Sequence, residues 1–219
     1  MGFIDFYMLK EEEKRTIFLN AGEKEGLPAY AIEKDWWVVQ TLRIIFEMEV
    51  REHLIFKGGT SLSKAWGLIN RFSEDIDLAL NREFLGFQSK DISKTQINEK
   101  LRPKSCEYIT EKFTPQLQAD YKAKGIEGLN FEFEKLDQGN QDPVSILVYY
   151  PPLIEHPEYI KPRVKVEIGS RSIKNPHTDR NFRSFVGDQF PDKKFSDQEI
   201  TIPCINPERT YLEKHPLCI

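Results

Sequence analysis

The 219-residue sequence has few cysteines, no long apolar run and little net charge. Its cysteines, Cys106, Cys204 and Cys218, lie far apart and form no Cys-x-x-Cys pair, so neither a disulfide framework nor a zinc site is expected. No segment approaches the roughly 18 apolar residues that cross a bilayer, and the N-terminus lacks the order of a secretory signal. We therefore expect a cytoplasmic protein without a membrane-spanning segment.

The composition is that of a folded globular protein. With 15 Phe, 8 Tyr and 3 Trp against a net charge of −4, the chain has the apolar material for a core and lacks the charge excess of a disordered chain. The 12 Gly and 13 Pro show no repeat, which excludes collagen-like and low-complexity classes. The small negative charge gives no overall attraction to nucleic acid, so binding of that kind would need a local basic patch.

The apolar pattern predicts an α+β fold, a mixed sheet flanked by helices. Helical spacing predicts a helix over about residues 28–48, and residues 88–125 are expected to form helices that lie over the sheet. Residues 169–199 are expected to be rich in loops. Short apolar or alternating segments predict strands at 54–56, 75–80, 130–136, 145–150 and 163–168.

A glycine-rich segment follows the first predicted strand. Gly58 and Gly59 lack side chains that would keep a phosphate from the main chain, and Thr60 or Ser61 is expected to cap a short helix. The N-terminus of such a helix attracts anions. The spacing matches neither a Walker A loop nor Gly-x-Gly-x-x-Gly, and an ordinary tight turn explains the two glycines equally well.

Two aspartates lie on the next predicted strand. Asp75 and Asp77 are two residues apart, so both side chains face the same side while Ile76 points into the core. Paired carboxylates repel each other and suit a divalent cation that prefers oxygen ligands, such as Mg²⁺. The alternative is a solvent-facing acidic edge that binds nothing.

A third carboxylate is found on the strand predicted at 163–168, where Glu167 faces outward. If this strand is next to that of Asp75 and Asp77, the three carboxylates form one cluster, as in sites that hold Mg²⁺ for phosphoryl transfer. Mutual repulsion would then raise the pKa of at least one of them. Sequence alone does not place the two strands side by side.

Four segments together resemble a known family. Residues 57–64 (KGGTSLSK) and 71–78 (RFSEDIDL) closely resemble the signature of the AbiEii/AbiGii toxin family of nucleotidyltransferases, within the DNA polymerase β-like superfamily. Residues 33–36 (EKDW) are similar to the N-terminal helix of that family, and residues 208–214 (ERTYLEK) to its later lysine-bearing helix. The resemblance implies a polymerase β-like nucleotidyltransferase core.

The resemblance also implies roles for individual residues. Asp75, Asp77 and Glu167 would be the catalytic residues and would hold Mg²⁺ or Mn²⁺, with Glu167 the candidate general base. Taken alone, Lys214 would be an ordinary lysine on a helix surface. The residues implied to bind nucleotide are Gly58, Gly59, Thr60, Lys64, Ser73 and Lys214.

The implied activity is metal-dependent transfer of a nucleoside monophosphate from an NTP to a hydroxyl acceptor. The acceptor is expected to be RNA, in particular tRNA, and the protein to be the toxin of a type IV toxin–antitoxin or phage abortive-infection system with a cognate antitoxin.

Three regions are expected: a helical segment at 1–50 packed on the core, a catalytic core at 51–205, and the start of a helical region at 206–219. That last region is shorter than is usual in the family. The alternative hypothesis is accordingly an inactive, shortened remnant that only binds a nucleotide or a partner.

Overall fold

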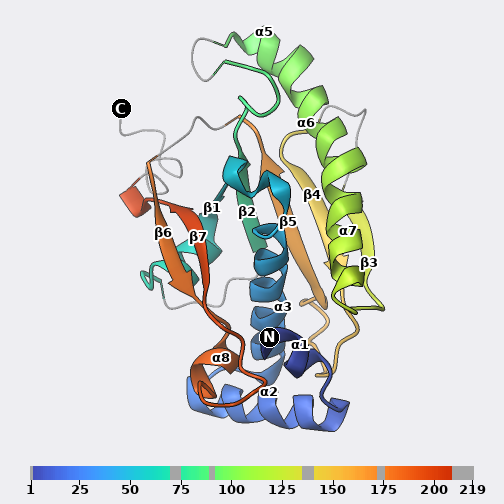
Figure 1. Cartoon of the computed structure of the whole chain (residues 1–219), viewed down its shortest axis with the longest axis vertical. Helices are drawn as coiled ribbons and strands as arrows, with labels where there is room; N and C mark the ends of the chain where they lie inside the picture. Colours follow the sequence, from blue (N-terminus) through green and yellow to red (C-terminus); the bar gives the residue numbers. More distant parts are fainter. Residues whose placement is uncertain (1, 70–74, 89–91, 135–140, 172–175, 209–219) are drawn as a thin grey trace.

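A seven-stranded mixed sheet, in the order β3-β4-β5-β2-β1-β7-β6, forms the centre of the part of the chain that the structure describes (Figure 1). The structure is a computed structural model that describes residues 2–69, 75–88, 92–134, 141–171 and 176–208. The strands are β1 (Leu54–Lys57), β2 (Asp75–Leu80), β3 (Asn130–Glu134), β4 (Val144–Tyr149), β5 (Arg163–Gly169), β6 (His177–Phe182) and β7 (Ile200–Ile205). The α+β class with a mixed sheet is thus confirmed.

Strand β2 lies at the centre of the sheet, antiparallel to β1 and parallel to β5. The neighbouring position of β2 and β5, which sequence alone left open, is therefore established. Alternation along these strands places Ile76, Leu78 and Val166 in the core, each with no exposed surface. The opposite face of the same strands carries Asp77 and Glu167.

Helix α3 (Ala29–Ile45) packs against the apolar face of the sheet and confirms the helix predicted over about 28–48. Pro28 precedes its first turn, where the missing N–H of proline costs nothing. The helix buries nearly every side chain, and Trp36 stacks against rings of α1 (Gly2–Tyr7). Helix α2 (Glu11–Glu25) and helix α8 (Phe185–Gln189) contact each other and α3.

A long helical stretch confirms the helices expected within 88–125. It consists of α5 (Lys94–Gln96), η3 (Ile97–Leu101), α6 (Arg102–Tyr108), η4 (Ile109–Phe113) and α7 (Thr114–Ala123). Tyr121 of α7 joins it to the core: its hydroxyl lies 2.6 Å from Thr41 Oγ1 of α3, and its ring packs edge-on against Phe131 of β3. Helices α3 and α7 therefore lie on one side of the sheet, and within the described part of the chain no long helix covers the Asp77 face.

Residues 169–199 differ from the prediction of a loop-rich segment, because they contain β6 and α8. Strand β6 pairs with β7 alone, at the edge of the sheet. Its sequence, His-Thr-Asp-Arg-Asn-Phe, is mostly polar and exposed, so it lacks the apolar alternation by which strands are predicted.

The division of the chain into three regions at residues 50 and 205 stays a prediction. Among the described residues, no helix has the length and apolar character needed to cross a bilayer.

The start of α3 is clamped to the segment between β4 and β5 by a buried carboxylate. Glu33 Oε1 accepts a hydrogen bond of 2.7 Å from the backbone N–H of Leu153, and Oε2 accepts one of 3.1 Å from Ile154. His156 Nε2 lies 3.3 Å from the same carboxylate. Burial raises the pKa of Glu33 from its ordinary 4.5 to about 7, although the two N–H donors favour the ionised form.

Replacing Glu33 by glutamine should make the free energy of unfolding less dependent on pH between about 4.5 and 7. The unfolded chain loses the Glu33 proton near pH 4.5, whereas the folded chain keeps it up to about pH 7, so the free energy of unfolding falls as pH rises through this window. Glu33→Gln cannot ionise and should escape a loss on the order of 2 kcal/mol. Urea denaturation at pH 5 and pH 8 measures the difference, and equal losses in both proteins would contradict the expectation.

Candidate active site

A row of polar residues crosses five strands of the uncovered face. Glu134 on β3 lies opposite Ser145 on β4, and Ser145 lies opposite Glu167 on β5. Glu167 in turn lies opposite Asp77 on β2, and Asp77 lies opposite Lys57 on β1. Directly opposed residues on neighbouring strands have Cβ atoms about 4.5–5.5 Å apart. The sheet therefore brings Asp77 and Glu167 together, as the sequence predicted for neighbouring strands.

Asp77 and Glu167 share a hydrogen bond, and their pKa values move in opposite directions. Burial raises the pKa of Asp77 well above its usual range, and the negative charge of Glu167 raises it further. Of the two carboxyl groups, Asp77 is therefore the more readily protonated. This agrees with the expectation that repulsion raises the pKa of at least one carboxylate in the group.

Glu167 is kept ionised by the donors around it. Burial alone would raise its pKa, but Lys165, the Ser145 hydroxyl and the hydrogen bond with Asp77 together lower it. Lys165 Nζ lies 2.8 Å from Glu167 Oε1 and 2.7 Å from a carboxylate oxygen of Glu134, and Ser145 Oγ donates to Glu167 at 3.2 Å. Of the two carboxyl groups, Glu167 is therefore the more readily ionised.

The glycine segment lies against Asp77. Helix α4 (Gly58–Thr60) and the turn η2 (Ser61–Ala65) continue directly from β1, and Gly58 has a φ of 79°. A Cβ atom at Gly58 would lie 1.9 Å from Asp77 Oδ2 and 2.7 Å from its Cγ, so only glycine fits. The close approach that the sequence predicted for a phosphate is here made by the Asp77 carboxylate.

The cap expected at Thr60 or Ser61 is wrong. The helix begins at Gly58, and Thr60 has helical dihedral angles with its hydroxyl directed to the backbone carbonyl of Asp75. That bond ties the glycine segment to the first residue of β2. Gly59 follows Gly58 within the first turn, and the helical segment ends at Ala65.

Lys64 forms a buried ion pair. Its ammonium group lies 2.8 Å from Asp35 Oδ1 and 3.8 Å from the centre of the Phe185 ring, and the side chain is only 10% exposed. The structure thus directs Lys64 toward α3 and α8, and its contact with nucleotide stays a prediction. Ser73 and Lys214 lie outside the described residues.

The three-carboxylate cluster is less closed than expected. Asp75 begins β2 and is exposed, and its register partner on β5 is Lys165 rather than a carboxylate. Within residues 2–69, 75–88, 92–134, 141–171 and 176–208, no group of three or more His, Cys, Asp and Glu side chains is arranged to hold a metal ion. Asp77 and Glu167 are the pair the structure brings into contact.

A cavity of about 370 Å³ opens over this pair. Its lining includes both carboxylates together with Lys57, Gly169 and Arg171. Lys57 and Arg171 were not predicted as site residues. The register of Lys57 with Asp77 could not be known before the strands were paired, and Arg171 follows β5 without any motif that marks it.

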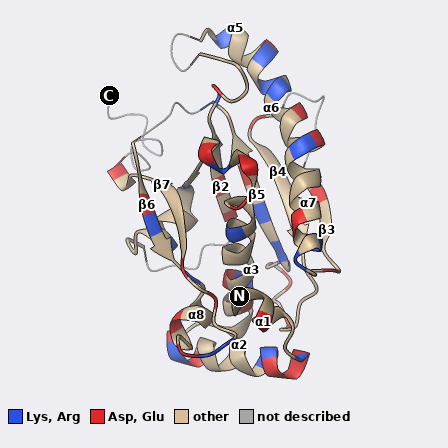
Figure 2. Cartoon of the chain, viewed as in Figure 1, with Lys and Arg blue, Asp and Glu red and all other residues tan. Residues whose placement is uncertain are grey.

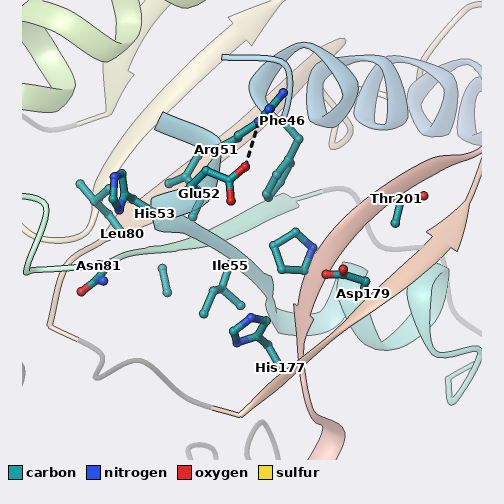
Figure 3. A pocket seen from close by; sticks show the side chains of 13 residues that line it. Phe46, Arg51, Glu52, His53, Ile55, Leu80, Asn81, His177, Asp179 and Thr201 are labelled. Atoms are coloured by element: carbon teal, nitrogen blue, oxygen red, sulfur yellow. Dashed lines mark hydrogen bonds and ion pairs between the residues drawn. The ribbon is translucent and has the colours of Figure 1, made fainter. Parts of the chain in front are cut away.

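A second cavity, of about 460 Å³, lies farther along β1 (Figure 3). It is bordered by Ile55 and Ala79, each two residues from Lys57 and Asp77 on the same strand face, and by His53 and His177. The ion pair between Arg51 and Glu52 lies at its rim. None of the predicted site residues lines this cavity.

The mixed sheet, covered by helices on one face and carrying a glycine-led helix beside paired carboxylates on the other, is consistent with a nucleotidyltransferase fold. The family model described as nucleotidyl transferase AbiEii toxin, type IV TA (toxin–antitoxin) system, matches residues 41–215. The chain therefore belongs to this family of toxins, which implies a cognate antitoxin. A search of curated proteins found no match.

Proposed function

We propose that this protein transfers a nucleoside monophosphate from an NTP to a hydroxyl group of RNA, in particular tRNA, and thereby acts as a toxin. The observation that carries the proposal is the register pairing of Asp77 with Glu167 on the uncovered sheet face, in contact with the glycine-led helix. This arrangement places the start of a helix, which attracts anions, directly against one of two carboxylates that line the same cavity. Such a combination suits a substrate that carries phosphates and a divalent cation.

The donor set fits a divalent cation that prefers oxygen. Asp77 and Glu167, with Asp75 at the start of the same strand, would hold Mg²⁺ or Mn²⁺. Mg²⁺ in proteins commonly uses one or two carboxylates and completes its shell with water and substrate phosphates, so a closed three-carboxylate site is not required. When bound, the cation would offset negative charge on the phosphate oxygens.

The residues of this chain then have separate tasks in the transfer. The backbone N–H groups from Gly58 to Thr60 bind the triphosphate, and Lys64, Ser73 and Lys214 are the further predicted nucleotide contacts. Glu167 accepts the proton of the attacking hydroxyl on a carboxylate oxygen. A new P–O bond forms to that hydroxyl oxygen as the P–O bond to pyrophosphate breaks.

A transfer assay tests this proposal. Purified protein with Mg²⁺, NTPs labelled at the α-phosphate and total tRNA should label RNA, and Asp77→Asn should lower the rate by roughly 10³-fold or more. Asp120→Asn is the matched control and should leave the rate unchanged, because Asp120 is a half-buried residue of α7 that does not line the cavity. Transfer that survives in Asp77→Asn would contradict the assigned role.

Melting curves separate loss of function from loss of fold. Mg²⁺ should raise the melting temperature of the wild type but not that of Asp77→Asn, because the ligand binds only the folded wild-type site. Without metal, Asp77→Asn should be at least as stable as the wild type, since it removes a buried acid beside Glu167. A wild-type protein that binds NTP without labelling RNA would favour the binding-only alternative.

A further inference from the structure

Arg171 is held rigidly at the rim of the catalytic cavity. Its Nε lies 3.1 Å from Asp142 Oδ2, and its Nη2 donates to the Asp142 carbonyl oxygen at 2.7 Å. The side chain is nevertheless 54% exposed, and in the described part of the chain Nη1 has no hydrogen-bond partner. One side of the guanidinium is therefore fixed, and about half of the side chain stays exposed.

The support for Arg171 is itself buried. The Asp142 side chain has no exposed surface, and its Oδ1 accepts a hydrogen bond of 2.9 Å from the backbone N–H of Ser170. Arg82, which follows β2, donates to the carbonyl oxygen of Arg171. Asp142 thus holds the guanidinium while Arg82 holds the backbone of the same residue, and a cation ordered before binding is how a protein prepares an anion site in advance.

Arg171 and the glycine segment lie in opposite directions along β2 from Asp77, and only Arg171 lines the cavity. Gly58 approaches Asp77 at the end of β1. Arg171 lies beyond Gly169, the last residue of β5, which pairs with Ala79 farther along β2. The carboxylates lie between the two. A phosphate bound by Arg171 is therefore separate from those bound at the start of α4.

Further basic residues lie toward the same end of the molecule. Figure 2 shows Lys and Arg along α5 and α6, and Lys104 of α6 lies 5.7 Å from the centre of the Phe87 ring. Phe87 belongs to the segment after β2, where its N–H donates to the carbonyl of Arg82. The segment after β2 thus contacts Arg171 through Arg82 and helix α6 through Phe87. Cationic side chains placed along such a path suit binding of a nucleic-acid backbone.

We propose that Arg171, fixed by Asp142, binds a backbone phosphate of the acceptor RNA next to the nucleotide whose hydroxyl reacts. The inference rests on the proposed nucleotidyl transfer for its substrate class. The planar guanidinium suits a phosphate because two of its N–H groups can donate to two phosphate oxygens. In Arg171 the contacts with Asp142 already order this group. Arg171 holds the acceptor in place and takes no part in proton transfer.

Binding measurements without turnover test this inference. The probes are fluorescent tRNA and, separately, NTP analogues with a methylene group between the α- and β-phosphates. Arg171→Ala should weaken tRNA binding about tenfold and leave the affinity for the analogues unchanged. The slope of the logarithm of tRNA affinity against the logarithm of salt concentration reports the number of phosphate contacts. In Arg171→Ala this slope should decrease by the amount that corresponds to about one contact.

Two further variants guard against an indirect effect on the fold. Arg183→Ala removes an arginine with a similar carboxylate partner, Asp188 at 2.9 Å, beside α8, and should leave tRNA binding unchanged. Arg171→Lys keeps a positive charge near Asp142 but loses the fork, and should weaken tRNA binding by a smaller factor than Arg171→Ala.

Three outcomes would overturn the inference: equal tRNA affinity in Arg171→Ala and the wild type, a loss confined to the NTP analogues, or a wild type that does not bind tRNA. If the wild type labels RNA while Arg171→Ala binds tRNA normally, this inference fails and the proposed function stands. If Arg171→Ala loses tRNA affinity but the wild type transfers nothing, the binding site stands and the proposed function fails.

Discussion

Replacing Gly58 by alanine is expected to lower nucleotidyl transfer by at least about 10²-fold, because a displacement near 1 Å at a reacting group has an effect of that size. The added Cβ would lie 1.9 Å from Asp77 Oδ2 and 2.9 Å from its Cβ, so Asp77 or the glycine helix must move. Either shift separates Asp77 from Glu167 or from the bound phosphates. Initial rates of label transfer to tRNA measure the effect.

The control for this variant is Gly26→Ala. Gly26 ends α2 with a φ of 68°, close to the 79° of Gly58, but a Cβ there meets nothing within 4 Å. Both alanines must adopt a left-handed conformation, which costs about 1–2 kcal/mol of stability. Only Gly58→Ala should lose transfer activity, and equal activities in the two folded variants would show that contact with Asp77 has no bearing on catalysis.

Replacing Asp35 by alanine is expected to lower the free energy of unfolding by about 3–5 kcal/mol, the usual result of leaving a buried charge unpaired. Lys64 would lose the carboxylate at 2.8 Å while remaining about nine-tenths buried. The backbone N–H of Phe185 would lose its acceptor as well, since it donates to Asp35 Oδ2 at 2.8 Å. Urea denaturation at pH 7 gives the difference.

A double-mutant cycle isolates the pair from the packing around it. Asp35→Leu with Lys64→Met removes both charges and should recover much of the stability that Asp35→Leu alone loses, because no unpaired ion remains. An exposed pair provides the comparison: Glu11 lies 3.6 Å from Arg15 on α2, and Glu11→Ala should cost less than about 1 kcal/mol. Strictly additive effects of Asp35→Leu and Lys64→Met would contradict a coupled buried pair.

The fold was predictable where one face of an element is apolar over several turns or residues. Strand β5 meets this condition by strict alternation, and helix α3 and strand β2 carry apolar residues at helical and alternating spacing. Strand β6 does not: it pairs on one side alone and is mostly exposed, so its polar residues satisfy the backbone ladder without any apolar pattern. Pairing of this kind is decided by tertiary contacts.

The candidate site was predictable to the extent that it lies within one strand. The two-residue spacing of Asp75 and Asp77 was enough to place them on one face, but the contact between Asp77 and Glu167 depends on strand order. The direction of a side chain on a helix could not be predicted from the sequence. Lys64 was expected to contact the phosphates of the nucleotide, and in the structure it forms an ion pair with Asp35. Arg171 depends on a buried partner, Asp142, that no local pattern links to it.

The strand order has a consequence for when the toxin becomes able to act. Asp77 meets its partner only through β5, and β1, which leads into the glycine segment, is flanked by β7 at Ile200–Ile205. Parallel pairings between segments so distant in sequence form late, after the intervening chain has been ordered. A nascent chain on the ribosome therefore lacks an assembled site until synthesis has passed residue 167, and the sheet that supports it is complete only after residue 205.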